Sequence, residues 1–131
     1  MLLDTSGLLC LHHRDEPLHD DARMLFDSAA IKLTHSYVLA EFVVLAHARS
    51  LPRQPSLLFI EAVLRNPEIE VVWIDEDLHR LALSFLQGRV GKPYSLCDAI
   101  SFLLMKSYDI SYALTSDPHF EQEGFVPLLK P

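Results

Sequence analysis

Four acidic side chains stand in or directly after apolar segments of the sequence. They are Asp4, Glu41, Asp98 and Asp117. Hard carboxylate oxygens are good ligands for Mg²⁺ and Mn²⁺, and these ions usually act on phosphates. A bound ion can activate a water and stabilise the entering and leaving oxygens of a displacement at phosphorus. The acids therefore predict metal-dependent hydrolysis of phosphodiester bonds.

Each acid also has a structural explanation of its own. Asp4 stands at a position typical of a helix N-cap, whose side chain accepts a backbone N–H. Asp117 is also typical of an N-cap, because the proline after it would occupy the first position of a helix. Ser95 and Asp98 have the spacing of a capping box. Glu41 lies in an otherwise apolar helix, where an unpaired buried carboxylate is energetically expensive. It could form an ion pair with a distant Arg or lie on a partly wet strip of the helix.

The elements that position these acids alternate between strands and helices. Strands are expected at 1–4, 31–34, 69–74, 110–115 and 125–129, of which 69–74 is the clearest interior strand. Helices are expected at 6–13, 18–30, 36–49, 56–65, 78–88 and 95–105, with a proline-bounded linker at 51–55. This alternation predicts an α/β fold, a three-layer α/β/α sandwich with a central, mostly parallel sheet.

The fold would bring the acids together at one edge of the sheet. Asp4 and Asp117 follow two strands and therefore lie at their carboxyl ends, where ligands gather in open parallel sheets. Asp98 begins the helix that leads into the second of these strands, and Glu41 has to reach the edge from a buried helix. Four carboxylates in one cleft would repel one another, and a divalent cation removes that conflict.

Length and composition set the broad class. The 131 residues fit a single domain over 1–131, and the chain is 50% hydrophobic and 22% charged, as in globular proteins. No stretch has the roughly 20 apolar residues of a membrane span, and no secretory signal is recognisable, so a cytoplasmic location is expected. Cys10 and Cys97 are expected to be buried, reduced thiols. The net charge of −7 argues against broad electrostatic binding of nucleic acid.

Four segments together resemble the PIN domain, specifically the VapC-type toxin nucleases. They are Asp4-Thr5-Ser6 after an apolar strand, Ala40-Glu41-Phe42, the segment 95–102, and the segment 114–120 with Gly124-Phe125. The resemblance covers nearly the whole chain and is most specific in its C-terminal third. Asp109 departs from it, because similar sequences commonly carry Gly at this turn position.

The resemblance implies a Mg²⁺- or Mn²⁺-dependent ribonuclease, often a toxin that a small antitoxin protein blocks, and usually a homodimer. Carried over by motif, Asp4, Glu41 and Asp98 would be the main metal ligands, and Asp117 would complete the site directly or through water. Hydroxyl groups would hold the carboxylates or waters; these residues are Thr5, Ser6, Ser95 and Thr115.

RNA contact is expected from Arg89 and Lys92, in the loop before the Asp98 helix, with ordinary surface solubility as the alternative. His119 stays outside the predicted catalytic set. An antitoxin segment could bind an apolar groove between the helices 36–49 and 56–65. We therefore predict an endoribonuclease that is the toxin of a toxin–antitoxin pair; the alternative is a catalytically silent PIN-like module that acts by binding a partner.

Overall fold

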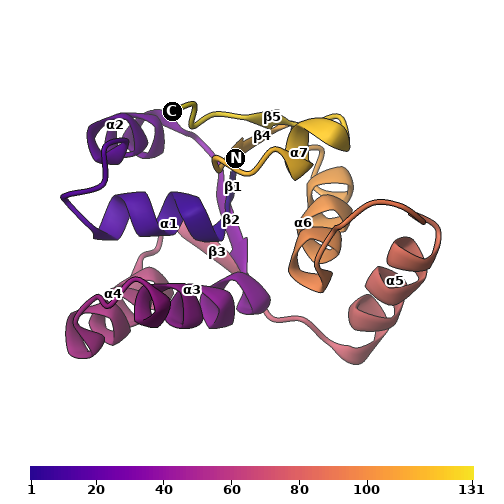
Figure 1. Ribbon diagram of the computed structural model, residues 1–131, viewed down its shortest axis with the longest axis horizontal. Coiled ribbons are helices and arrows are strands. Elements are labelled where there is room, and N and C mark those ends of the chain that lie inside the picture. Colours follow the sequence, from indigo (N-terminus) through magenta and orange to yellow (C-terminus); the bar gives the residue numbers. More distant parts are fainter.

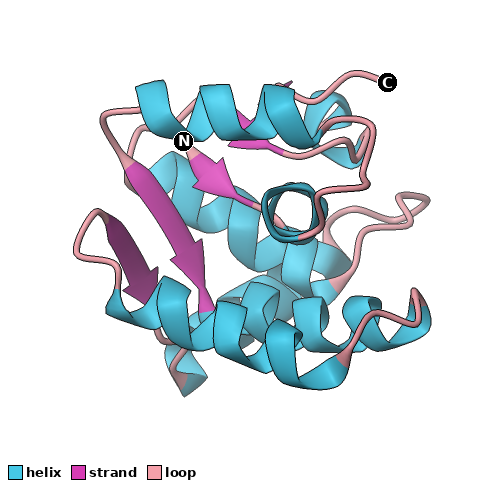
Figure 2. Cartoon of the chain, turned by 90° about the vertical axis from the view of Figure 1, so that its left-hand side faces the viewer, coloured by secondary structure: helices cyan, strands magenta, loops and turns pink.

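The computed structural model describes residues 1–131 and contains a five-stranded sheet between two layers of helices (Figure 1). The strands are β1 (Leu2–Leu3), β2 (Lys32–His35), β3 (Ile69–Val72), β4 (Tyr112–Leu114) and β5 (Val126–Pro127). They lie in the order β3-β2-β1-β4-β5, and every pair is parallel (Figure 2). The predicted α/β sandwich with a parallel sheet is confirmed.

Seven helices cover the two faces of this sheet. They are α1 (Thr5–His12), α2 (His19–Ser28), α3 (Ser36–Ala48), α4 (Arg53–Arg65), α5 (Glu76–Gln87), α6 (Leu96–Ser107) and α7 (His119–Gln122). In Figure 1, α1 to α4 lie on one side of the sheet and α5 to α7 lie on the other. None of these helices is both long and apolar enough to cross a membrane.

The two central strands contribute to a hydrophobic core on each face. Successive side chains of a strand point to opposite faces. Leu3 and Leu114 accordingly pack with residues of α1 to α4, whereas Leu2 and Ala113 pack with residues of α5 to α7. All four are fully buried. The strand at the start of the chain is thus short and buried on both faces, as predicted.

Strand β3 is an edge strand, so its prediction as an interior strand was wrong. It pairs only with β2, its apolar residues are half-buried, and Glu70 is exposed. The β-branched run reflects packing on both faces, because Val71 contacts one core and Val72 the other. Burial on two faces does not reveal whether a strand has one neighbour or two.

Two helices differ from the sequence-based prediction. Helix α4 begins at Arg53 rather than at Ser56, so part of the expected linker forms its first turn. Pro55 fits there because N–H groups of the first turn have no partner within the helix. Helix α3 is not buried on every side, since Val44 is 68% exposed.

A buried histidine ties the sheet to the helices that carry Glu41 and Asp98. His35 Nδ1 accepts a hydrogen bond from the backbone N–H of Val38 at 3.4 Å, which caps α3. The ring proton is therefore on Nε2, which donates to the Ser101 hydroxyl of α6 at 2.8 Å. Burial lowers the pKa of His35 to about 3, so the ring stays neutral near pH 7.

Gly7 allows α1 to lie directly against the backbone of β4. A Cβ atom at this position would lie 2.0 Å from the carbonyl oxygen of Leu114 and 2.8 Å from its carbonyl carbon. These backbone atoms cannot move aside without shifting the strand. The close approach also brings the hydroxyl of Ser6 to 3.1 Å from that of Thr115, at the carboxyl edge of the sheet.

We expect Gly7→Ala to destabilise the protein by about 1–3 kcal/mol or more, because α1 has to move away from β4. The same change in an unconstrained helix would stabilise it by up to about 1 kcal/mol. Urea denaturation measures the free energy of unfolding. Gly88→Ala is the control, since its nearest neighbour would be an oxygen at 3.5 Å. Equal effects of the two substitutions would contradict the packing argument.

Candidate metal centre

Asp4 begins the site at the carboxyl end of β1, and a hydroxyl network connects it to the end of β4. Its residue is 5% exposed, and its Oδ2 accepts a hydrogen bond from Thr115 Oγ1 at 2.8 Å. Thr115 Oγ1 accepts in turn from the backbone N–H of Asp117 at 3.0 Å. Ser6 Oγ accepts from the backbone N–H of Ser116 at 3.0 Å. The ends of both strands are thereby fixed around Asp4.

Glu41 reaches this network from the surface of α3. Thr5 Oγ1 donates a hydrogen bond of 2.6 Å to Glu41 Oε1. Glu41 is exposed, so it is not the buried carboxylate that the apolar helix indicated, and it agrees with the alternative of a partly wet strip. The apolar residues around it suggested burial, but Val44, one turn further along, lies on the same exposed strip. An ion pair with a distant Arg is not formed.

A depression of about 330 Å³ opens between the ends of the two central strands and α3. Its lining comprises Asp4, Thr5, Ser6, Glu41, Val44, Leu45, Ala48 and Asp117. None of these side chains carries a positive charge. The depression therefore offers three carboxylates without a protein cation to balance them.

Asp98 has both the predicted capping role and a free oxygen. Its Oδ2 accepts a hydrogen bond from the backbone N–H of Ser95 at 3.1 Å, and the hydroxyl of Ser95 accepts from the backbone N–H of Asp98 at 3.0 Å. This capping box starts α6. Asp98 is 7% exposed, and its Oδ1 accepts no hydrogen bond from the protein. The cap fixes the side chain and leaves one oxygen available for a ligand.

His119 belongs to this group, although the sequence analysis left it out. Its Nδ1 lies 2.9 Å from Asp98 Oδ2 and 3.5 Å from Asp117 Oδ1. One ligand atom from each of the three residues lies within 4.8 Å of the others. Asp117 Oδ1 also accepts the backbone N–H of His119 at 2.9 Å, which explains the geometry. The signal in the sequence was an Asp and a His two residues apart after a strand.

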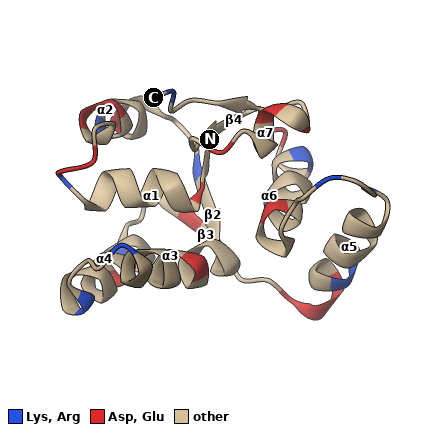
Figure 3. Ribbon diagram, viewed as in Figure 1, with Lys and Arg blue, Asp and Glu red and all other residues tan.

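The electrostatics show that the acids influence one another. The pKa of Asp4 is raised to about 7, mainly by burial and further by the charges of Asp98 and Glu41, while the hydrogen bond from Thr115 opposes the shift. Burial is also the main cause that raises the pKa of the Cys97 thiol, followed by the charges of Glu41, Asp4 and Asp98. Cys97 and Cys10 are buried and free, as predicted. In Figure 3 the acidic segments at the end of β1, on α3, at the start of α6 and before α7 lie around the middle of the view.

This donor set fits a divalent cation. Carboxylate oxygens dominate it, one oxygen of the buried Asp98 has no protein partner, and no Lys or Arg lines the depression. A divalent ion would bind such oxygens and offset both the burial and the repulsion that raise the pKa of Asp4. The structure thus brings the four predicted acids to one edge of the sheet, and their roles as ligands stay predictions. Thr5 and Thr115 donate to carboxylates, whereas the hydroxyls of Ser6 and Ser95 accept backbone N–H groups.

The two residues expected to contact RNA have different environments. Arg89 donates to Glu123 Oε1 from Nε at 3.0 Å and from Nη2 at 2.7 Å, and its guanidinium lies 4.2 Å from the centre of the Phe85 ring. Its charge is therefore compensated within the protein. Lys92 is exposed and has no ion pair. Of the two, Lys92 is the freer cation.

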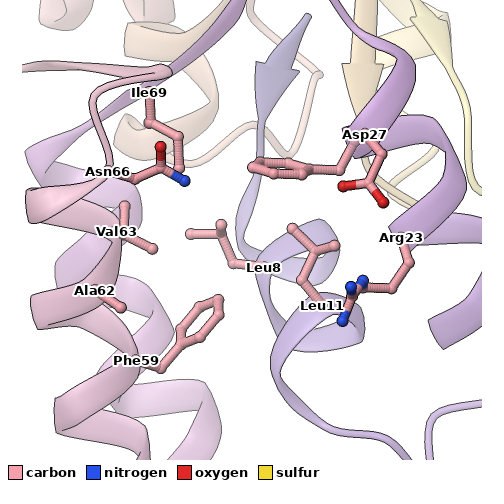
Figure 4. A pocket seen from close by; sticks show the side chains of 10 residues that line it. Leu8, Leu11, Arg23, Asp27, Phe59, Ala62, Val63, Asn66 and Ile69 are labelled. Atoms are coloured by element: carbon pink, nitrogen blue, oxygen red, sulfur yellow. The ribbon is translucent and has the colours of Figure 1, made fainter.

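An apolar groove lies elsewhere on the molecule, between α2 and α4 and over α1 (Figure 4). It has a volume of about 230 Å³ and is lined by apolar side chains that include Leu8, Leu11, Phe59 and Val63. The apolar groove predicted from the sequence was placed between α3 and α4, where only a small depression is present. Helices α3 and α4 contact each other there and leave little space.

Comparisons with known proteins give matches over nearly the whole chain. The PIN domain family model matches residues 1–125. The 23S rRNA-specific endonuclease VapC20 of Mycobacterium tuberculosis, from strains CDC 1551 / Oshkosh and ATCC 25618 / H37Rv, is 28% identical over 127 residues, which are 96% of this chain and 95% of the relative. The crystal structure of M. tuberculosis VapC20, described as a Sarcin-Ricin loop cleaving toxin, has a TM-score of 0.84 and 26% identity, and the match covers 99% of this chain and 98% of that one.

We expect the metal-free protein to lose stability as the pH rises, because of Asp4. The pKa of this carboxyl is 3.8 in the unfolded chain and about 7 in the folded protein. The protonated carboxyl therefore contributes fully to folding stability below pH 3.8, and this contribution is lost as the pH rises through 7. The loss approaches about 4 kcal/mol, and Asp4→Asn should abolish it.

Urea denaturation in EDTA at pH 5 and pH 8 measures this effect. The free energy of unfolding of Asp4→Asn should exceed that of the wild type by more at pH 8 than at pH 5. Asp109→Asn is the matched control, because Asp109 lies in an exposed turn at φ 56°, a conformation that Asn adopts readily. A stability difference between Asp4→Asn and the wild type that is the same at both pH values would contradict the prediction.

Proposed function

Because the chain belongs to the PIN domain family, we propose that it is a divalent-metal-dependent endoribonuclease of the VapC type and the toxin of a toxin–antitoxin pair. The observation that carries this proposal is the meeting of four carboxylates at the carboxyl edge of β1 and β4 without a balancing protein cation. The likeness to VapC20 over nearly the whole of both chains supports it.

The proposed cofactor is Mg²⁺ or Mn²⁺, held by Asp4, Glu41, Asp98 and Asp117. Such an ion supplies Lewis acidity toward a phosphate and lowers the pKa of a water that attacks it. The chain itself fixes the ligand oxygens. Hydroxyls hold Asp4 and Glu41 through Thr115 and Thr5, and the capping box holds Asp98.

The substrate is proposed to be RNA that enters the open depression beside α3, with Lys92 and the less available Arg89 as contacts at its approach. The few cations around the site imply that recognition depends on the shape of the RNA more than on broad charge attraction. Its relative VapC20 is described as a Sarcin-Ricin loop cleaving toxin. A stem-loop RNA with the sequence of the Sarcin-Ricin loop is therefore the first substrate to test. We further propose that the chain forms one PIN-like domain over 1–131. Two copies of it would form a homodimer in the cytoplasm.

Replacing a proposed ligand should abolish cleavage without unfolding the protein. We expect Asp98→Asn and Glu41→Gln each to reduce the rate of RNA cleavage with Mn²⁺ by at least about a hundredfold, since each removes a charged ligand. Glu41 is exposed, so its variant should keep the wild-type melting temperature. Asp109→Asn is the control and should cleave as fast as the wild type.

Full activity of either variant would contradict the proposed site. A wild-type protein that binds its antitoxin tightly but cleaves no RNA would instead be the silent binding module. The measurement is gel-resolved cleavage of the stem-loop RNA, with each variant's folding checked by thermal denaturation.

The proposed partner is a small antitoxin whose apolar segment binds the groove between α2 and α4. Apolar side chains line its centre, whereas Arg23, Asp27 and Asn66 supply polar groups to its lining (Figure 4). An amphipathic helix fits such a groove by placing its apolar face inside and its polar residues against these groups.

We expect Ala62→Arg to block the antitoxin and to leave RNA cleavage intact. Ala62 is exposed on α4 and lines the groove, so a long charged side chain would occupy the apolar space without disturbing the core. Gln54→Arg, on the exposed start of the same helix, is the control. Co-expression with the product of the adjacent gene measures inhibition; undiminished inhibition of Ala62→Arg would place the antitoxin elsewhere.

A further inference from the structure

The site contains one nitrogen donor among its carboxylates. His119 Nδ1 lies 2.9 Å from Asp98 Oδ2 and 3.5 Å from Asp117 Oδ1, and each of the three residues offers one ligand atom within 4.8 Å of the other two. Asp4 and Glu41 lie outside this tight group, whereas Asp117 also lines the depression that contains them. Asp117 therefore connects a set of oxygen donors with a set that includes an imidazole.

The spacing of these atoms suits coordination of one ion. Ligand atoms about 2.1 Å from an octahedral ion lie about 3.0 Å apart when they occupy adjacent positions. The separations of 2.9 and 3.5 Å around His119 Nδ1 are close to this value. Asp98 Oδ1, which has no hydrogen bond from the protein, offers a further position at the same centre.

The imidazole is held in place by residues that do not belong to the acid cluster. The ring of Tyr94 packs against the ring of His119 in a T-shaped arrangement, with 5.4 Å between the centroids. The Tyr94 hydroxyl donates to Glu123 Oε2 at 3.0 Å, and Arg89 binds the other oxygen of that carboxylate. Tyr94 is buried, so the position of His119 is fixed by packing.

We propose that His119 is a metal ligand and that Asp98, Asp117 and His119 form a subsite that selects Mn²⁺ over Mg²⁺. This inference rests on the proposed function, because it concerns the same metal centre. Mg²⁺ strongly prefers oxygen ligands and keeps its waters, whereas Mn²⁺, the first ion of the divalent transition-metal affinity order, also accepts an imidazole nitrogen. A site of carboxylates alone would discriminate less between the two ions. Tyr94 and Glu123 are positioning residues for the imidazole.

The alternative role of His119 is to orient Asp98 through a hydrogen bond without touching the ion. Pulsed electron paramagnetic resonance of Mn²⁺ bound to the full chain separates the two roles. A directly bound imidazole gives a nitrogen hyperfine coupling, and labelling the histidines with ¹⁵N changes that coupling in the wild-type protein. His119→Asn, which keeps a side-chain amide able to donate to Asp98, should lose the coupling.

Calorimetric titration with each ion alone gives a second readout. We expect the ratio of Mn²⁺ affinity to Mg²⁺ affinity to fall at least about tenfold in His119→Asn and to stay unchanged in His13→Asn, a half-buried histidine with no hydrogen bond to the site. Absence of a histidine-derived coupling in the wild type, or its persistence in His119→Asn, would overturn the inference.

The failure of this inference differs from the failure of the proposed function. A wild-type protein that cleaves RNA equally well with both ions, without nitrogen coupling, keeps the function and loses the His119 subsite. A wild-type protein that binds Mn²⁺ through His119 and cleaves no RNA keeps the subsite and loses the function.

Discussion

Burial of the Asp4 carboxyl beside other acids, at the carboxyl edge of β1 and β4, is the constraint on which the rest of the site depends. Asp4 is almost fully buried beside the charges of Asp98 and Glu41, and this environment raises its pKa to about 7. Hydrogen bonds from Thr115 and Thr5 offset part of the unfavourable energy. The remainder destabilises the folded protein, and a bound divalent ion would relieve it. Binding of that ion would therefore stabilise the folded state.

The framework tolerates this destabilisation because both faces of the central strands are fully packed. Leu2 and Leu3 lie in separate cores, and Gly7 lets α1 approach β4 closely enough for hydroxyl contacts at the strand ends. His35 joins β2 to the middle of α6 and caps α3, so the helices that carry Glu41 and Asp98 are tied to the same buried side chain. The acids are thus fixed by elements that the two cores and the His35 contacts hold in place.

Sequence periodicity predicted the sheet, its parallel direction and the meeting of the acids, because burial and strand–helix alternation are encoded locally. It failed where the answer depends on neighbours. The apolar run around Glu41 did not reveal the exposed strip on α3, and the β-branched run of β3 did not reveal an open edge. His119 was missed for the same reason, because it contacts Asp98 across 21 residues of sequence, from α7 to α6.

Asp98 shows why a correct structural interpretation of a residue does not exclude a chemical one. A carboxylate has two oxygens, and the capping box uses only Oδ2. The cap also places the side chain at the N-terminal end of α6. A residue that caps a helix is therefore already oriented, as a metal ligand must be. Local signals for N-caps at the carboxyl edge of a parallel sheet should accordingly raise the expectation of a ligand, provided that other acids reach the same edge.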